Sequence, residues 1–219
     1  MLLQLPVNDR VCHGRPYRGK DASERIKERR RAFLHAGIEM FGVQGYAGTG
    51  IRDVCITAGL TERYFYESFK NKEDLLSAVY RKIIEEEKDA FMEILMSDGE
   101  TREEKVARTL HTFFTYLRDD PRRARIQFME VLGVGPRVDK EYLDAFDTLS
   151  GMMALLLKTI FPKADLEGAS GRIIPTMLAG SVVYVAMQWV LKGYDIPIAD
   201  LVEQISRIFF ITGEGLTAS

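Results

Sequence analysis

The sequence predicts an all-α protein of about nine helices. Apolar residues recur at helical spacing along most of the 219 residues, and no segment combines period-two alternation with hairpin signals. With 46% apolar and 28% charged residues, the chain can build a packed core and is not a disordered polypeptide. At about 100–200 residues per domain, its length allows one large domain or two modest ones.

Start and stop signals divide the chain into helices. The first is predicted to begin at Ser23, a good N-cap, and to end at Gly42 and Gly45. A later helix begins at Pro121, because proline is tolerated in a first helical turn but not in a helix interior. The remaining helices are predicted over residues 51–58, 62–69, 72–96, 101–118, 121–132, 139–161, 166–192 and 197–212.

Charge is distributed unevenly along the chain. Residues 10–31 contain nine basic and three acidic residues, a net charge of +6, whereas the whole chain carries −2. Residues 81–219 carry a net charge of −5. This asymmetry predicts that only the N-terminal end of the molecule meets a polyanion.

Residues 49–69 predict a helix-turn-helix. Two short helices flank Ala58-Gly59-Leu60-Thr61, where Gly59 permits the sharp corner. A second helix that presents arginine and tyrosine from its first turns suits a DNA major groove, where phosphates position the helix and arginine recognises guanine. The predicted core of this unit joins Ile51, Val54, Cys55, Leu60, Phe65 and Phe69 to Phe33, Gly37 and Phe41 of the first helix.

The run FGVQGYAGTGIRDVCITAGLTERYFYESFKNKEDLL (residues 41–76) closely resembles the DNA-binding domain of the tetracycline-repressor (TetR) family of bacterial transcriptional regulators. The resemblance covers about 50 residues (26–76), and the rest of the chain is similar only in layout and helical content. The matching positions are Phe41, Gly45, Tyr46, Thr49, Ile51, Ala58-Gly59-Leu60-Thr61, Tyr66, Phe69 and Lys72-Glu73-Asp74-Leu75-Leu76.

The resemblance implies a ligand-responsive regulator that binds a palindromic DNA operator as a homodimer. Repression is the default role in the family, and activation stays open. The implied domains are a flexible basic arm (1–22), a helix-turn-helix DNA-binding domain (23–71) and a helical effector-binding and dimerisation domain (72–219). In the arm and just after it, Arg15, Arg18, Lys20 and Arg25 are implied to follow phosphates or a minor groove.

Eight residues are implied to contact DNA, which are Thr49, Arg52, Thr61, Arg63, Tyr64, Tyr66, Lys72 and Arg25. Arg63 and Tyr64 are implied to reach base edges, and Arg52 either a base or a phosphate; the other residues are implied to hold phosphates. Two alternatives stay open, namely that both threonines are only helix caps and that both tyrosines are surface-packing aromatics. The chain departs from the family pattern at Gly50, where a second threonine is common, and at Tyr64-Phe65, so a base preference cannot be transferred.

The two C-terminal helices, at about residues 166–192 and 197–212, predict a homodimer interface. Ile173 to Leu191 is uncharged over nearly the ~20 residues that cross a bilayer. Its Pro175, Gly180 and Gln188 fit a helix in a protein interface better, so no membrane span is expected. A soluble protein must cover such a helix, and in the family the matching pair forms a four-helix bundle with its copy.

A ligand pocket is predicted on the helices that the family packs around its cavity. Linings rich in Met and Phe suit a small apolar or aromatic effector, although these residues could instead only fill the core. The residues assigned to the pocket are Phe91, His111, Phe114, Met129, Met153, Met177 and Tyr184. Arg125, Gln127 and Glu130 are further polar anchors, and the 72–96 helix is expected to transmit ligand binding to the DNA-binding domain.

Other classes of protein lack support in the sequence. It contains no glycine-rich phosphate loop, no GxSxG and no HExxH, so neither catalysis nor a cofactor is expected. The two cysteines Cys12 and Cys55 indicate a reducing cytoplasmic setting, and the Cys12-His13 pair lacks further metal ligands nearby, so no metal is expected. The alternative function is a helical interaction module that has lost DNA binding, which the retained donors Thr49, Arg63 and Lys72 disfavour.

Overall fold

The computed structural model describes residues 22–218, which form nine α-helices, one π-helical turn and no strand. The predicted all-α class is therefore confirmed. Apart from Ala22, the predicted arm of residues 1–22, with its Arg15, Arg18, Lys20 and Cys12-His13, lies outside the described residues.

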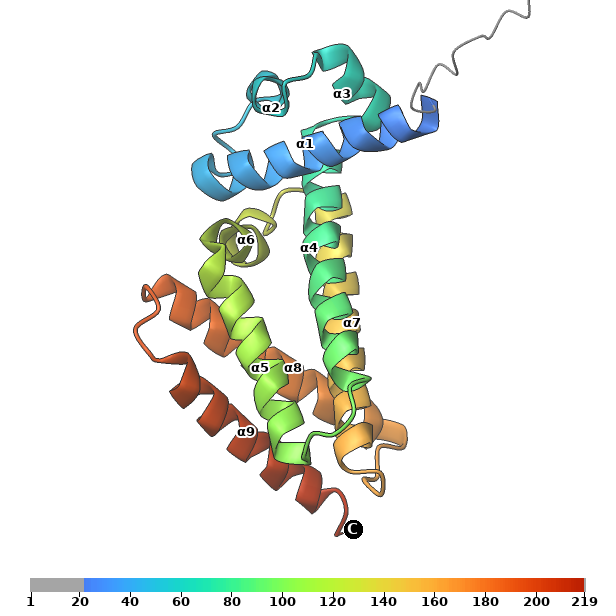
Figure 1. The fold of residues 1–219 in the computed structure, drawn as a ribbon, viewed down its shortest axis with the longest axis vertical. Coiled ribbons are helices and arrows are strands. Elements are labelled where there is room, and N and C mark those ends of the chain that lie inside the picture. Colours follow the sequence, from blue (N-terminus) through green and yellow to red (C-terminus); the bar gives the residue numbers. More distant parts are fainter. Residues whose placement is uncertain (1–21, 219) are drawn as a thin grey trace, which may run out of the picture.

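Three helices form a head at one end of the molecule, across the start of a long connecting helix (Figure 1). The head consists of α1 (Ala22–Gln44), α2 (Ile51–Ala58) and α3 (Glu62–Ser68). The connecting helix is α4 (Lys72–Leu95), which runs from the head into the body of the molecule.

The body consists of α5 (Arg102–Asp119), α6 (Pro121–Arg125), the π-helical turn η1 (Ile126–Glu130), α7 (Pro136–Ile160), α8 (Gly168–Leu191) and α9 (Ile198–Gly215). In it α7 packs along α4, α8 packs on α7, and α9 packs on α5 (Figure 1). The prediction of one continuous helix over residues 121–132 is wrong, because α6 gives way to η1 after one turn. π-Helical turns are rare and occur frequently at functional sites.

The glycines of the head have different roles. Gly59 adopts a left-handed conformation (φ +65°) and ends α2, as predicted. Gly45 (φ +82°) follows the last residue of α1, but Gly42 lies inside that helix and does not end it. A Cβ atom at Gly42 would lie 2.3 Å from Cβ of Arg122, so this glycine lets α6 approach α1 closely.

The core of the head is aromatic and closely packed. Phe33, Phe65 and Phe69 are at most 2% exposed, and the rings of Phe33 and Phe65 meet edge to face with centroids 5.5 Å apart. Val54 and Phe41 complete this core, as the sequence predicted. The same cluster continues along the first half of α4, so the head is packed firmly onto the connecting helix.

By length and composition, α8 is the single helix among residues 22–218 that could cross a membrane, with 22% of its most apolar window buried. Several of its large apolar side chains are exposed, among them Ile173, Met177 and Tyr184. Ile208 and Ile211 of α9 are exposed as well. The described residues contain no group of three or more His, Cys, Asp or Glu that could hold a metal ion.

Candidate functional site

The helix α3 presents polar side chains to solvent from a buried anchor. Phe65 is fully buried, whereas the side chain of Arg63 is 85% exposed and Tyr66 is 58% exposed. Thr61 stands at the N-cap position, but its hydroxyl makes no capping hydrogen bond. These three side chains therefore form an exposed surface of donors around the first turns of α3.

A stack of side chains joins α3 to α1. The guanidinium of Arg29 lies 4.4 Å from the ring centroid of the half-buried Tyr64. Nη2 of Arg29 also lies 3.5 Å from the Glu67 carboxylate. Nε of Arg63 donates to the same carboxylate over 3.3 Å. Both tyrosines assigned to DNA thus make packing contacts: Tyr64 lies under Arg29, and the ring of Tyr66, although 58% exposed, meets that of Phe65 edge to face with centroids 5.4 Å apart.

Thr49 does not present its side chain to solvent, contrary to its expected contact with phosphate. The residue is 2% exposed, and its hydroxyl donates to the carbonyl oxygens of Gly45 (2.7 Å) and Met40 (3.2 Å). It does not cap α2 either, because Gly50 holds the N-cap position. There the carboxylate of Asp53 accepts from the Gly50 amide over 2.9 Å, which is the half of a capping box that does not need an N-cap side chain.

Lys72 fastens the loop between α1 and α2. Its ammonium donates to the carbonyl oxygens of Tyr46 (2.7 Å) and Thr49 (2.9 Å) and lies 4.1 Å from the centroid of the Tyr46 ring. Burial lowers the pKa of Lys72 from its ordinary value. An ammonium has three N–H donors, so one is left for the expected phosphate. The other predicted DNA-contacting residues, Arg25 and Arg52, are exposed on the head.

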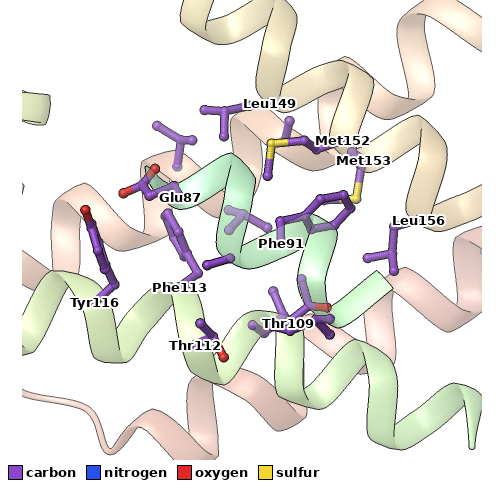
Figure 2. A pocket seen from close by; sticks show the side chains of 16 residues that line it. Glu87, Phe91, Thr109, Thr112, Phe113, Tyr116, Leu149, Met152, Met153 and Leu156 are labelled. Atoms are coloured by element: carbon purple, nitrogen blue, oxygen red, sulfur yellow. The ribbon is translucent and has the colours of Figure 1, made fainter. Parts of the chain in front are cut away.

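A cavity of about 100 Å³ lies between α4, α5, α7 and α8 (Figure 2). The predicted pocket residues Phe91 and Met153 line it. So do several neighbours on the same helices, chiefly Phe113, Tyr116, Leu149, Met152 and Leu156. The lining is thus aromatic and aliphatic, with few polar groups.

The other five residues assigned to the pocket do not line this cavity. Phe114 is fully buried in the core, with its ring 5.4 Å from that of Trp189. His111 is exposed, and Met129 is 39% exposed on η1. Met177 and Tyr184 are 66% and 59% exposed. They lie on the outer face of α8, because Ala179, Val182 and Val183 are the α8 residues that face the cavity.

Sequence reasoning missed the one carboxyl group in the cavity lining. Glu87 is 7% exposed, and its Oε1 accepts from Nε2 of Gln127 over 2.7 Å. Its Oε2 and the side-chain carbonyl of Gln127 are buried without a hydrogen-bond partner. Burial raises the pKa of Glu87 to about 7, although the hydrogen bond from Gln127 and the charge of Arg123 both act to lower it.

The turn η1 also contacts the head. The carboxylate of Glu130 accepts from the amide of Tyr46 over 2.6 Å and from Nε of Arg125 over 2.8 Å. Nη1 of Arg125 donates to the carbonyl of Val43 over 2.8 Å. The predicted anchors Arg125 and Glu130 therefore hold the end of α1 and the loop before α2, and Gln127 alone of the three reaches a cavity residue.

The fold and the exposed α3 define a helix-turn-helix regulator with a separate ligand-sized cavity. Residues 33–79 match the family model for bacterial regulatory proteins of the tetR family. These residues therefore form a DNA-binding domain of the tetR-family type, found in DNA-binding transcriptional regulators.

Three known proteins show the extent of this similarity. The chain is 33% identical over 70 residues to YezE, an uncharacterised HTH-type transcriptional regulator of Bacillus subtilis, over 32% of this chain and 36% of that protein. It is 24% identical over 186 residues to a fatty acid metabolism regulator protein of Bacillus subtilis, over 78% of this chain and 91% of that one. The crystal structure of Bacillus subtilis FadR in complex with stearoyl-CoA has the same fold, with a TM-score of 0.71 at 18% identity over 82% of this chain and 96% of that one.

Proposed function

We propose that this protein controls transcription by binding a palindromic operator as a homodimer and releasing it when a small apolar effector enters the cavity. The observation that carries the proposal is the exposed donor surface of α3, formed by Thr61, Arg63 and Tyr66. Arg25 and Arg52 extend it with positive charge. Phosphate contacts by such residues position a helix in the major groove, and an arginine there recognises guanine.

The homodimer uses the exposed faces of α8 and α9. A single α3 of two turns binds DNA weakly, and two copies held one helical turn apart multiply the affinity. The exposed Ile173, Met177 and Tyr184 of α8 and Ile208 and Ile211 of α9 supply the apolar area for this contact. A second subunit over α8 accounts for its exposed apolar side chains without a membrane span, and a protein that binds operators acts in the cytoplasm.

The cavity is the effector site. An apolar cavity of about 150 Å³ holds benzene, so the present volume of about 100 Å³ suits a short chain, and a ring must widen it slightly. A longer molecule must displace flexible wall residues such as Met152 and Met153, which line one side of it. The similarity to a fatty acid metabolism regulator and to a stearoyl-CoA complex supports an effector that is mainly hydrocarbon.

Two elements join the cavity to the head. Helix α4 carries Glu87 and Phe91 in the cavity and Lys72 under the loop before α2. Turn η1 carries Gln127 beside Glu87 and Glu130 on the amide of Tyr46. A ligand that binds one arrangement of these elements better than another changes the spacing of the two α3 helices, and so weakens operator binding.

Operator binding tests the proposal directly. Gel-shift selection from a pool of palindromic duplexes is expected to recover a bound sequence, with affinity that falls steeply as salt rises. Arg63→Ala is expected to weaken binding, and Lys163→Ala, an exposed change in the body, is the matched control. A stable monomer, or a failure to bind any duplex at low salt, would overturn the proposal and favour an interaction module without DNA binding.

The route through η1 has its own test. Glu130→Gln weakens the charge-assisted bonds to Tyr46 and Arg125 without removing a cavity residue. We expect an effector to bind this variant as it binds the wild type but to release the operator less completely. Normal release by the variant would leave α4 as the only route.

A further inference from the structure

The polar groups that line the cavity differ in whether they have hydrogen-bond partners within the protein. The Thr109 hydroxyl donates to the carbonyl of Lys105 over 2.9 Å, and the Tyr116 hydroxyl donates to the carboxylate of Glu86 over 2.9 Å. Glu87, in contrast, keeps one oxygen without a partner although the residue is 7% exposed. Figure 2 shows its carboxyl group among the aromatic side chains of the site. Among the residues of the lining, Glu87 is therefore the one with a buried polar atom that lacks a partner.

When Glu87 is ionised, the unpaired atoms are both acceptors. Oε2 of Glu87 and Oε1 of Gln127 are both buried without a donor, and the two side chains are joined by the 2.7 Å bond between their other polar atoms. A buried acceptor without a partner destabilises a protein, because its hydrogen bond to water is lost and not replaced. A bound molecule that brings N–H or O–H groups to this pair removes that penalty, whereas one that brings a carbonyl or a carboxylate does not.

The charge of the site favours a cation over an anion. Of the described residues that line the cavity, none is Lys, Arg or His. The guanidinium of Arg123, whose charge acts on Glu87 without a hydrogen bond to it, donates to Glu86 and to Asp120. Because burial in apolar surroundings opposes the ionisation of Glu87, a ligand cation beside it restores the charged form and is bound in return.

We propose that the effector is a lipophilic molecule with a protonated amine, held inside the cavity by the carboxylate of Glu87. This inference rests on the proposed function, since it names the chemistry of the effector for that same site. An acyl thioester group would not satisfy this site, because it has no N–H or O–H to donate to these acceptors. The hydrocarbon part lies against Phe91, Phe113 and the two methionines.

Three one-ring probes of matched size test the head group. Phenethylamine carries a cation, phenethyl alcohol a neutral donor and hydrocinnamate an anion, and each is titrated calorimetrically into the full-length protein near neutral pH. The amine is expected to bind about tenfold to a hundredfold more tightly than the alcohol, because hydrogen bonds to charged groups are the stronger ones. The anion is expected to bind most weakly.

Glu87→Gln removes the charge while keeping the shape of the side chain. In this variant the amine is expected to lose its advantage over the alcohol, while Glu85→Gln, an exposed change on the same helix, leaves it intact. Equal binding of amine and alcohol to the wild type, tightest binding of the anion, or no binding of any probe overturns the inference. Operator binding is measured in parallel without any probe, so a failure of the proposed function is seen separately.

Discussion

The head and the cavity region of this molecule are both apolar, but they are packed for different purposes. In the head, Phe33, Phe65 and Phe69 are buried and meet each other ring to ring. Around the cavity, Phe91 and Phe113 stand beside about 100 Å³ of empty space and a carboxyl group without a full set of partners. The difference shows which part is built for rigidity and which part is built to take up a further molecule.

The largest expected effect is on stability, when a phenylalanine is replaced by alanine in the head and at the cavity. Phe65→Ala in the head is expected to destabilise the protein by about 3–5 kcal/mol, since a fully packed ring leaves a cavity behind. Phe113→Ala is expected to be roughly half as destabilising, because one side of this ring already faces empty space. Urea unfolding of both variants measures the difference. Equal losses would show that the cavity is filled in solution.

The buried carboxyl group predicts a pH dependence that the head lacks. The pKa of Glu87 is raised from 4.5 to about 7, so the folded state binds this proton more tightly than the unfolded chain. Its contribution to stability is complete below pH ~4.5 and is lost as the pH rises through about 7, a change of roughly 3 kcal/mol.

Chemical unfolding from pH ~5 to pH ~8 measures this dependence as a difference between wild type and Glu87→Gln. The stability of the wild type relative to the variant is expected to fall over this range. A constant difference would show that the carboxyl group has an ordinary pKa and is hydrated.

The exposed surface of the head is expected to tolerate substitutions that its core does not. Arg63→Ala is expected to weaken operator binding by about 1–3 kcal/mol and to relax the preference for one base. The melting temperature is expected to stay unchanged, because the side chain is 85% exposed. Fluorescence anisotropy with the selected operator and single-base variants of it measures both effects. An equal loss on every sequence would assign Arg63 to phosphate.

The smallest expected effect distinguishes the two threonines of the head. Thr49→Val is expected to destabilise the protein by about 1–2 kcal/mol, because its hydroxyl donates to two buried carbonyl oxygens. Thr61→Val is expected to leave stability nearly unchanged and to weaken operator binding, because its hydroxyl makes no capping bond. Thermal unfolding and anisotropy of the two variants separate these roles. The reverse pattern would restore Thr49 as a phosphate contact.

The head was predictable from sequence because its signals are local. Gly59 between two short helices, and aromatic residues at helical spacing, specify the turn and the core without reference to distant parts of the chain. The errors in the head concern side chains with two possible partners. Thr49 is flanked by both the end of α1 and the start of α2, and the sequence cannot show that its hydroxyl points inward.

The cavity was harder to predict because α8 is apolar on every side. Met177 and Tyr184 were assigned to the pocket, although no polar face marks which side of the helix is outside. Glu87 stands within the charged run Glu85-Glu86-Glu87-Lys88, so its residue type does not reveal that it is buried. Its position four residues after Ile83 and four before Phe91 puts it on the buried face of α4, and this spacing was the available signal.

The widened turn η1 determines where its side chains point. In an α-helix, residues three apart share a face, so Gln127 and Glu130 would project in nearly the same direction. The wider π-helical turn points the two side chains in different directions. The Gln127 amide donates to Glu87 of α4, whereas the Glu130 carboxylate accepts from the backbone amide of Tyr46 in the loop before α2. Deletion of Ile126 keeps Gln127 and Glu130 three residues apart and is expected to return the segment to an α-helix, which would place both side chains on one face and break the link between the cavity and the head.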